Sequence, residues 1–227
     1  MTPPEPPFSK PAPLEYEELY RPGMGTENVG PLLRSLVQMV RPSRTLEIGA
    51  GYTTPFLLEA IVNNERVFND GNLSQSYFDN HQYDPKLKVL SQSYFDNYQY
   101  DPKLVVIDNM SLGELAKKPG MKGIIESKYI DFIEGQFQGK AEQLFRKYGK
   151  FDFVWYDCGG PPEYKDFFSE YWEICSNYVL FHFTYYEGKP NSNMDIILSQ
   201  MTGDPFRFDI VEPHKRRQGS VTILRKG

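Results

Sequence analysis

The chain has few cysteines, no long apolar run and no excess of positive charge. Its 227 residues include two cysteines, Cys158 and Cys175, too few for a disulfide framework or a cysteine-rich zinc site. No stretch reaches the ~18 consecutive apolar residues that a membrane-spanning helix needs. Asp and Glu outnumber Lys and Arg by 30 to 25, and a net charge of −5 disfavours nucleic acid as a partner. Ordinary soluble globular classes remain.

The amino terminus also lacks the basic and apolar regions of a secretory signal, so we expect a cytoplasmic protein without a membrane partner. Eight of the 18 prolines fall within the first 31 residues. Proline removes backbone donors and disfavours helix, which predicts an extended arm over residues 1–30. The arm is either a disordered tail or a strap over a site or a neighbouring subunit. The rest, 31–227, is expected to form one domain.

Helical and strand-like segments alternate along that domain. Residues 31–40 have apolar side chains at helical spacing, 44–48 form a strand, and a glycine turn leads into a helix from 53. This order is typical of the first unit of a parallel α/β sheet. It predicts a doubly wound, mostly parallel seven-stranded sheet that ends in an antiparallel hairpin. The further strands are expected at 104–108, 130–135, 151–157, 177–184, 206–213 and 219–226, and the further helices at 112–118, 122–128, 140–149, 163–175 and 194–201.

A tandem duplication interrupts the first half of the domain. Residues 74–90 and 91–107 are identical at 14 of 17 positions, and two copies are too few for a solenoid. The second copy alone continues into Asp108 to give the strand LVVID. We therefore assign the second copy to the sheet and treat about 70–103 as an insertion. Because both copies offer nearly the same strand, the register could slip between them.

A glycine turn carries the first candidate site. Gly49 and Gly51 follow a strand and precede a helix, where the backbone can approach a ligand and the helix offers unpaired N–H groups. Thr54 stands where the dinucleotide motif G-x-G-x-x-G has its third glycine, which disfavours a nicotinamide-dependent oxidoreductase. The carboxylate of Glu47 can lie near a cationic group of the ligand.

Polar residues also end the later strands, where ligands bind in open α/β sheets. Asp108 can accept both hydroxyls of a ribose, or simply cap its strand. Gln136 in the segment 134–136 borders an adenine ring or belongs to a plain turn. Asp157 ends an otherwise apolar strand, and a buried carboxylate needs a partner, which favours a functional role.

A histidine lies among aromatic residues at the end of the 177–184 strand. His182 can act as a general base near neutral pH, or it is a core histidine bonded to a backbone carbonyl. Tyr185 and Tyr186 follow it as candidate walls of an acceptor site. His214 opens a basic loop that either receives an anionic group of the substrate or is a solvated hairpin tip.

Four motifs in this order resemble those of class I S-adenosylmethionine-dependent methyltransferases, especially the caffeoyl-CoA and catechol O-methyltransferase branch. TLEIGAGYTT resembles the branch's LEIG-type glycine motif, and YIDFIEG resembles its I-x-F-x-x-G strand. FDFVWYDCGGPPEYKDFFSEYWEI resembles FDF-[IV]-x-x-DADK-x-x-Y and the helix after it. NYVLFHFTYYEG resembles G-x-[IV]-x-x-DN-x-L-W-x-G. The resemblance runs over residues 30–225.

The resemblance implies a Rossmann-like fold, S-adenosyl-L-methionine as cofactor and a small-molecule acceptor. Members of this branch commonly dimerise, so it also implies a homodimer. By the same resemblance, Glu47, Gly49 and Gly51 would line the cofactor's methionine end, Asp108 would hold its ribose, and Gln136 would lie near its adenine. The further candidate cofactor-binding residues are Ala50, Tyr52, Thr53, Asn109 and Asp157.

The chain departs from the branch at its metal site. His182-Phe183 replaces the Asp-Asn pair, and Cys158-Gly159-Gly160 replaces the second Asp and the Lys of the DADK segment. Mg²⁺ prefers several oxygen ligands, so we predict that no metal is bound. Asp108 also lies 57 residues after Gly51, far beyond the ~20 of a simple βαβ unit.

These observations predict metal-independent methyl transfer to a hydroxyl or amine of a small molecule. The aromatic lining favours an aromatic acceptor. The catalytic residues would be His182, as the base, and Asp157, which orients it. The alternative is a non-catalytic protein that binds S-adenosylmethionine or a nucleoside in a regulatory or scaffold role.

Overall fold

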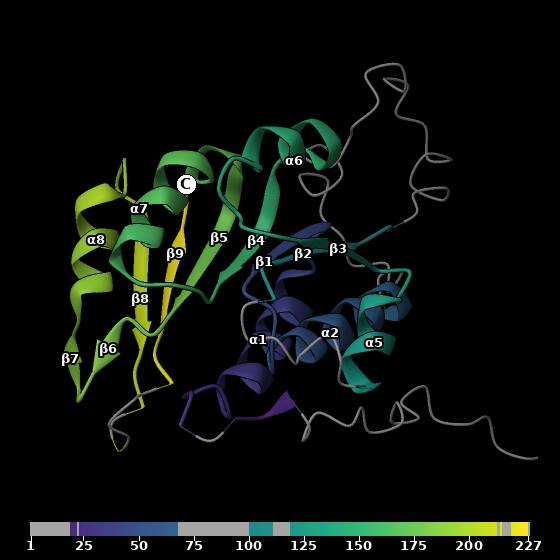
Figure 1. Cartoon of the computed structure of the whole chain (residues 1–227), viewed down its shortest axis with the longest axis horizontal. Coiled ribbons are helices and arrows are strands. Elements are labelled where there is room, and N and C mark those ends of the chain that lie inside the picture. Colours follow the sequence, from purple (N-terminus) through teal and green to yellow (C-terminus); the bar gives the residue numbers. More distant parts are fainter. Residues whose placement is uncertain are drawn as a thin grey trace, which may run out of the picture.

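The computed structural model describes residues 19–21, 23–67, 100–110, 119–212, 214 and 219–226. Within them, seven strands form one sheet in the order β3-β2-β1-β4-β5-β9-β8 (Figure 1). The first five are parallel, and β9 runs antiparallel to both of its neighbours. The predicted sheet and its terminal antiparallel pair are confirmed. The strands are β1 (Arg44–Ile48), β2 (Lys103–Asp108), β3 (Ile130–Glu134), β4 (Phe151–Tyr156), β5 (Cys175–His182), β8 (Phe206–Ile210) and β9 (Val221–Arg225).

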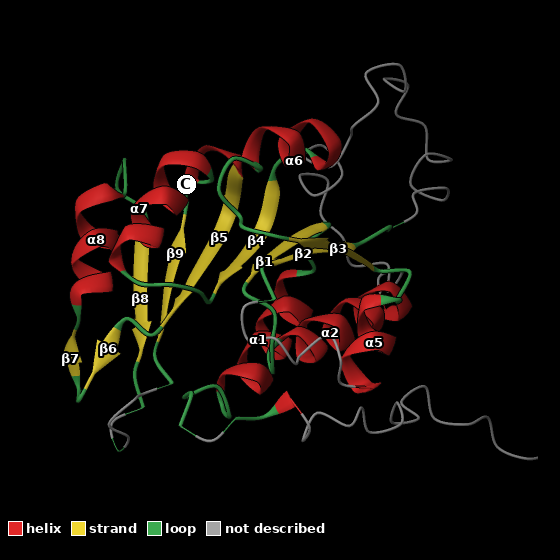
Figure 2. Cartoon of the chain, viewed as in Figure 1, coloured by secondary structure: helices red, strands yellow, loops and turns green. Residues whose placement is uncertain are grey.

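Helices cover both faces of this sheet, as a doubly wound fold requires (Figure 2). One face packs against α1, α2 and α5, and the other against α6, α7 and α8, with a separate apolar core under each group. None of the described helices has the length and apolar character needed to cross a membrane. The helices are α1 (Val29–Val40), α2 (Thr54–Val67), α5 (Pro119–Ile125), α6 (Ala141–Tyr148), α7 (Pro161–Glu170) and α8 (Ser192–Gln200).

The central strand β4 shows why the sequence forms this layered core. Phe153 and Trp155 pack on the side of α1 and α2, whereas Val154 and Tyr156 pack on the side of α6 and α7. Successive side chains of a strand point to opposite faces, so a strand covered by helices on both faces is apolar throughout. The nearly unbroken apolar run of 151–156 is this pattern.

Several boundaries differ from those the sequence predicts. The helix expected over 163–175 ends at Glu170, and a 3-10 turn η2 (Trp172–Ile174) leads directly into β5. The helix expected over 122–128 is α5, Pro119–Ile125. A short hairpin, β6 (Tyr185–Tyr186) with β7 (Lys189–Pro190), follows β5 and was not predicted. Local hydrogen bonding sets these ends, which hydrophobic periodicity does not report.

The second copy of the duplication supplies β2, as predicted. Lys103–Asp108 pairs in parallel with both β1 and β3. Tyr100, also in the second copy, donates a hydrogen bond from its hydroxyl to the carbonyl of Pro42 at 2.8 Å. The first copy at 74–90, the helix expected at 112–118 and residues 1–18 of the predicted arm lie outside the described residues.

Candidate active site

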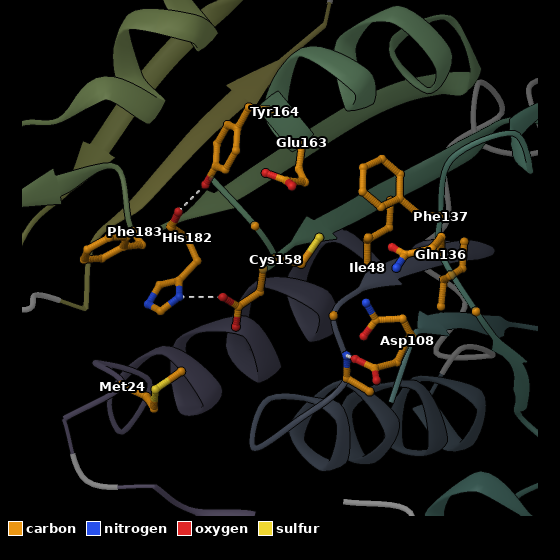
Figure 3. A pocket seen from close by; sticks show the side chains of 17 residues that line it. Met24, Ile48, Asp108, Gln136, Phe137, Cys158, Glu163, Tyr164, His182 and Phe183 are labelled. Carbon is orange, nitrogen blue, oxygen red and sulfur yellow. Dashed lines mark hydrogen bonds and ion pairs between the residues drawn. The ribbon is translucent and has the colours of Figure 1, made fainter. Parts of the chain in front are cut away.

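A pocket of about 420 Å³ lies at the carboxyl ends of β1, β2, β4 and β5. From β1 the chain runs to β2 and β3 on one side, and it then crosses to β4 and β5 on the other side of β1. Ligands of open α/β sheets bind at such a switch point. In Figure 3, Asp108 and Gln136 lie on one side of the pocket, His182 and Phe183 on the other, and Cys158 between them. The lining residues are Met24, Ile48, Gly49, Ala50, Ile107, Asp108, Asn109, Gly135, Gln136, Phe137, Asp157, Cys158, Gly159, Glu163, Tyr164, His182 and Phe183.

Gly49 is required by the geometry of the turn after β1. Its N–H donates to the carbonyl of Ile107 at 2.9 Å, its φ is +98°, and a Cβ there would lie 2.2 Å from the carbonyl oxygen of Asp157. Only glycine fits between β2 and β4 at this point. Gly51 has open space around it, and its N–H donates to the Oγ1 of Thr54 at 3.0 Å. The two glycines of the motif therefore have different roles.

The Asp108 carboxylate is held in place by main-chain groups. Its Oδ2 accepts the N–H of Ala50 at 2.9 Å, and its Oδ1 accepts the N–H of Met110 at 2.5 Å. Each carboxylate oxygen can accept a further hydrogen bond. The pocket side of β2 thus presents a fixed double acceptor at the place where the sequence predicts ribose binding.

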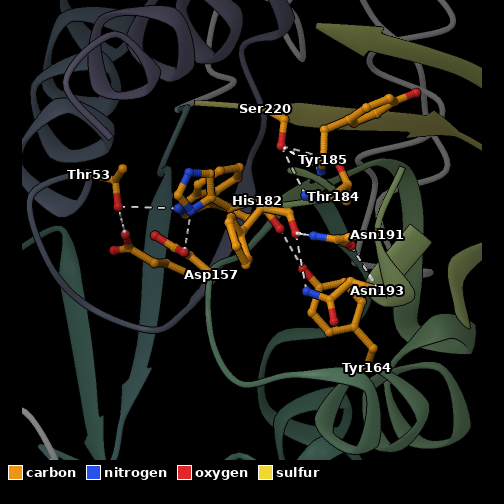
Figure 4. A network of polar contacts seen from close by, with 12 residues as sticks. Thr53, Asp157, Tyr164, His182, Thr184, Tyr185, Asn191, Asn193 and Ser220 are labelled. Atoms are coloured by element: carbon orange, nitrogen blue, oxygen red, sulfur yellow. Dashed lines mark hydrogen bonds and ion pairs between the residues drawn. The ribbon is translucent and has the colours of Figure 1, made fainter. Parts of the chain in front are cut away.

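Asp157 and His182 form a pair on the other side of the pocket. His182 Nδ1 lies 2.7 Å from Asp157 Oδ1, and only 4% of the His182 side chain is exposed (Figure 4). Because a carboxylate accepts hydrogen bonds, Nδ1 is the donor in this pair, and in a neutral imidazole the lone pair is then on Nε2. Nε2 is enclosed and has no hydrogen-bond partner among the described residues. The pair has the arrangement of an oriented base.

The backbone that follows His182 is held in an unusual conformation. Phe183 has φ of +54°, and its carbonyl accepts from the side-chain amides of Asn191 at 2.8 Å and Asn193 at 3.2 Å. Tyr164 donates to the carbonyl of His182 at 2.5 Å, and Ser220 Oγ accepts the N–H of Thr184 at 3.0 Å. Groups from α7, from the start of α8 and from the residue before β9 therefore hold the backbone that carries the His182 and Phe183 side chains.

Glu47 lies outside this pocket although it precedes the glycine turn. It is fully buried, and its Oε1 accepts the hydroxyl of Thr53 at 2.8 Å, while its Oε2 has no partner among the described residues. Thr53 also accepts the indole N–H of Trp155 at 3.2 Å. Burial raises the pKa of Glu47 to about 8, so the carboxyl is largely protonated at neutral pH.

Cys158 lines the pocket without the character of a nucleophile. Burial raises the pKa of its thiol to about 12, so almost no thiolate is present near neutral pH. Burial also raises the pKa of the Tyr164 hydroxyl well above its usual value. Both side chains shape the pocket in their neutral forms.

The structure brings together about half of the residues predicted for the site. Tyr52 instead makes edge-to-face ring contacts with Tyr20 and Phe56, and Tyr185 donates from its hydroxyl to Asp209 at 3.1 Å. Those that line the pocket are Gly49, Ala50, Asp108, Asn109, Gln136, Asp157 and His182. Those that do not are Glu47, Gly51, Tyr52, Thr53, Tyr185, Tyr186 and His214.

Sequence reasoning missed several lining residues, among them Met24, Phe137 and Tyr164. Phe137 directly follows the predicted Gln136, so its position after a strand end was an available signal. Met24 and Tyr164 come from a loop before α1 and from the first turn of α7, and no local pattern marks them. Among the described residues, no three or more His, Cys, Asp or Glu side chains are grouped to hold a metal ion.

The strand order, the helices on both faces and the pocket at the switch point define the class I methyltransferase fold. No protein-family model matches the chain, and no curated protein is significantly similar in sequence. Solved structures do resemble it. An O-methyltransferase from Bacillus cereus in complex with SAH has a TM-score of 0.59 at 14% identity, over 94% of this chain and 87% of that chain.

Two further structures resemble the chain to a similar degree. The O-methyltransferase TomG from Streptomyces achromogenes, involved in tomaymycin synthesis and in complex with SAM, has a TM-score of 0.59 at 16% identity, over 93% of this chain and 86% of that one. A putative caffeoyl-CoA O-methyltransferase from Staphylococcus aureus has a TM-score of 0.54 at 13% identity, over 94% and 88%. At these identities the likeness establishes the fold, which confirms the fold that the sequence resemblance implies.

Proposed function

We propose that this protein is a metal-independent methyltransferase that uses S-adenosyl-L-methionine and modifies a hydroxyl or amine of a small molecule. One observation carries the proposal. A single pocket at the switch point joins the fixed Asp108 carboxylate on one side to the Asp157–His182 pair on the other (Figure 3). The likeness to O-methyltransferases crystallised with SAM or SAH supports the choice of cofactor.

The residues on the β1–β2 side fit this cofactor. Asp108 would accept the two ribose hydroxyls, and Gly49 lets the main chain approach the ligand closely. Gln136 lines the same side of the pocket, where adenine would lie. A volume of about 420 Å³ is within the range of ligand pockets. When bound, the cofactor supplies an electrophilic methyl group on a sulfonium sulfur.

His182 would remove the proton of the acceptor. Asp157 accepts the hydrogen bond from Nδ1–H, which orients the ring and leaves the Nε2 lone pair to take a proton. Nε2 has no partner among the described residues, and an acceptor hydroxyl that reaches it would supply that partner. Phe183 also lines the pocket, which favours an aromatic acceptor.

The residues present do not fit a magnesium site of the kind the branch uses. One oxygen of Asp157 is engaged with His182 at 2.7 Å, and Phe183 offers no ligand atom at the next position. Mg²⁺ requires near-octahedral oxygen coordination. The proposal therefore assigns proton removal to an imidazole and not to a metal-bound acceptor.

The enclosure of Nε2 favours one second candidate, a non-catalytic protein that binds the cofactor or a nucleoside. With less than a tenth of His182 exposed, the site as it stands holds the base away from solvent. A regulatory or scaffold protein would need the Asp108 side of the pocket but not an accessible base.

Calorimetric titration with S-adenosylhomocysteine tests the proposal, with NAD as the control ligand. We expect micromolar binding that is the same in EDTA and in Mg²⁺, and about tenfold to a hundredfold weaker for Asp108→Asn, because a charged hydrogen-bond acceptor is lost. A panel of phenols, catechols and amines then separates the two candidates. Binding without methyl transfer to any acceptor would favour the non-catalytic role, and absence of binding would contradict both.

A further inference from the structure

Strand β8 forms one edge of the seven-stranded sheet. Its inner side pairs antiparallel with β9, and within the described part of the chain no strand pairs with its outer side. An unpaired edge presents a row of free N–H and C=O groups that another strand can join. The edge lies at the opposite end of the sheet from β3 (Figure 1).

Two phenylalanines make this edge unusually apolar. Phe206 is 68% exposed and Phe208 is 54% exposed. They lie on the same face of the strand, because successive side chains alternate between faces. Phe208 stands opposite Ile223 of β9, which is only half-buried, so the apolar surface continues onto the neighbouring strand. Exposed apolar groups gathered at one place mark interaction sites more often than isolated ones do.

The other edge strand is protected in the usual way. Asp131 of β3 accepts hydrogen bonds from Tyr148 at 2.6 Å and from Lys147 at 3.3 Å. The apolar residues Phe132 and Ile133 are at least partly buried. Charge and covering side chains are the devices by which proteins prevent edge-to-edge pairing. Both edge strands carry charged side chains, Asp131 on β3 and Arg207 with Asp209 on β8. The apolar side chains differ, because those of β3 are partly covered and the two phenylalanines of β8 are exposed, which points to a partner for β8.

We propose that β8 pairs with β8 of a second copy of this chain, antiparallel and about a two-fold axis at Phe208. The strand FRFDI has five residues, and Phe208 is its midpoint. In this register Phe208 meets Phe208, and Arg207 of each copy stands opposite Asp209 of the other. The strand is therefore complementary to itself in charge as well as in length.

The charges select this register over its neighbours. If the axis moved to Arg207, two arginines would face each other, and if it moved to Asp209, two aspartates would. Like charges directly opposite one another destabilise a strand pair, whereas opposite charges stabilise it. Within one copy, Arg207 Nε already lies 3.2 Å from Asp209 Oδ2, so both side chains are on the same face. In the dimer four alternating charges would line that face and the phenylalanines the other.

The geometry also sets the strength and the size of the assembly. A pair of five-residue strands buries less surface than a standard stable interface, so the association should depend on concentration. A two-fold interface uses the same surface on both copies and closes at the dimer. The proposal does not rest on the proposed function, because the pocket residues come from other strands and no catalytic step is involved.

Sedimentation velocity on the full chain over a concentration series tests the pairing. We expect the mass to rise from the 26.3 kDa of the monomer toward twice that value. Arg207→Asp alone and Asp209→Arg alone should each weaken the dimer at least tenfold, because each homodimer then opposes like charges. An equimolar mixture of these two variants should recover the dimer, since one strand is then acidic and the other basic at both positions.

Two controls and one further variant complete the test. Arg146→Asp on α6 and Met39→Asp on α1 change exposed residues elsewhere and should leave the dimer unchanged. Asp209 also accepts the hydroxyl of Thr222, so Asp209→Arg must be shown to fold by circular dichroism. If it does not fold, Phe208→Lys replaces it and should abolish the dimer. A wild-type chain that stays monomeric, or a dimer that tolerates Arg207→Asp or Phe208→Lys, would overturn the proposal.

Discussion

The two sides of the pocket are built by different means. On the β1–β2 side, main-chain N–H groups of Ala50 and Met110 fix the Asp108 carboxylate. On the β4–β5 side, a side chain fixes a side chain, since Asp157 orients His182. Asp108 is held by backbone N–H groups, which any residue at positions 50 and 110 except proline would supply, whereas the second arrangement requires two particular side chains at the ends of β4 and β5. The first side therefore depends on backbone geometry, and the second depends on the identity of two side chains.

The largest effect we expect is from Gly49→Ala, with Gly51→Ala as the matched control. A Cβ at Gly49 would lie 2.2 Å from the Asp157 carbonyl oxygen, and φ there is +98°, so both sides of the pocket would be displaced. We expect a loss of about 3 kcal/mol or more in unfolding free energy, as for severe steric and backbone strain, together with loss of S-adenosylhomocysteine binding. Gly51→Ala should change stability by less than about 1 kcal/mol. Urea unfolding and calorimetry measure both, and equal effects at the two glycines would contradict the close approach seen at Gly49.

The second largest effect should separate the cofactor affinity expected of the Asp108 side from the turnover expected of the His182 side. His182→Ala removes the proposed base without touching Asp108, so S-adenosylhomocysteine affinity should stay within about threefold while kcat falls by roughly 10²–10⁴, the usual contribution of a general base. His182→Gln, which keeps a polar group of similar size, should be equally impaired in turnover. A variant in which affinity and kcat fall together would mean that His182 supports the whole pocket and is not the base.

The place of each pocket residue relative to the strands explains which of them the sequence could predict. Gly49, Asp108, Asp157 and His182 all follow strand ends, and strand ends are visible as breaks in apolar runs. Met24 enters the pocket from a loop before α1, and only the packing of the whole chain brings it there. A pattern of a few residues cannot report such a contact.

The position of Glu47 outside the pocket had a signal in the sequence itself. Ile48 lines the pocket, whereas Glu47 does not, because neighbours on a strand point to opposite faces. Applied to 44–48, this alternation would have separated Glu47 from the ligand side. In the fold, the strands were predictable because the central ones are apolar throughout, but the break between α7 and η2 was not, since hydrogen bonding at the helix end decides it.

Glu47 gives a third test, in which the effect depends on pH. Its pKa is about 8 in the folded protein and 4.5 as an ordinary glutamate, so folding favours the protonated form. The stability it contributes is complete below pH 4.5, falls as pH rises toward 8, and is then constant. Across this interval we expect the free energy of unfolding of the wild type to fall by a few kcal/mol, and that of Glu47→Gln to fall much less. Urea unfolding at pH 5, 7 and 9 measures this, and the exposed Glu126→Gln is the control; equal slopes for Glu47→Gln and the wild type would refute protonation in the fold.

The smallest effect we expect concerns two residues, one on each side of the pocket, that share a left-handed backbone conformation. Met110 follows β2 with φ of +55°, and Phe183 follows β5 with φ of +54°. A left-handed conformation costs roughly 1–2 kcal/mol for residues with a Cβ, and glycine avoids this cost. Glycine should therefore stabilise more than alanine at each position, by about 1 kcal/mol, which reverses their usual order in regular structure.

Enzyme kinetics should then distinguish Met110 from Phe183, although the stability effects at the two positions are expected to be alike. Met110→Gly and Met110→Ala should both retain acceptor turnover, because Met110 donates its N–H to Asp108, which both variants keep, and its side chain is not among those that line the pocket. Phe183→Gly and Phe183→Ala should both raise KM for an aromatic acceptor, because each removes a ring that lines the pocket. Thermal unfolding and steady-state kinetics on the four variants give both readouts. Suppose that Phe183→Ala is as stable as Phe183→Gly, whereas Met110→Ala is less stable than Met110→Gly. The left-handed conformation at Phe183 is then not held by the fold, and the two sides differ in their backbone as well as in their side chains.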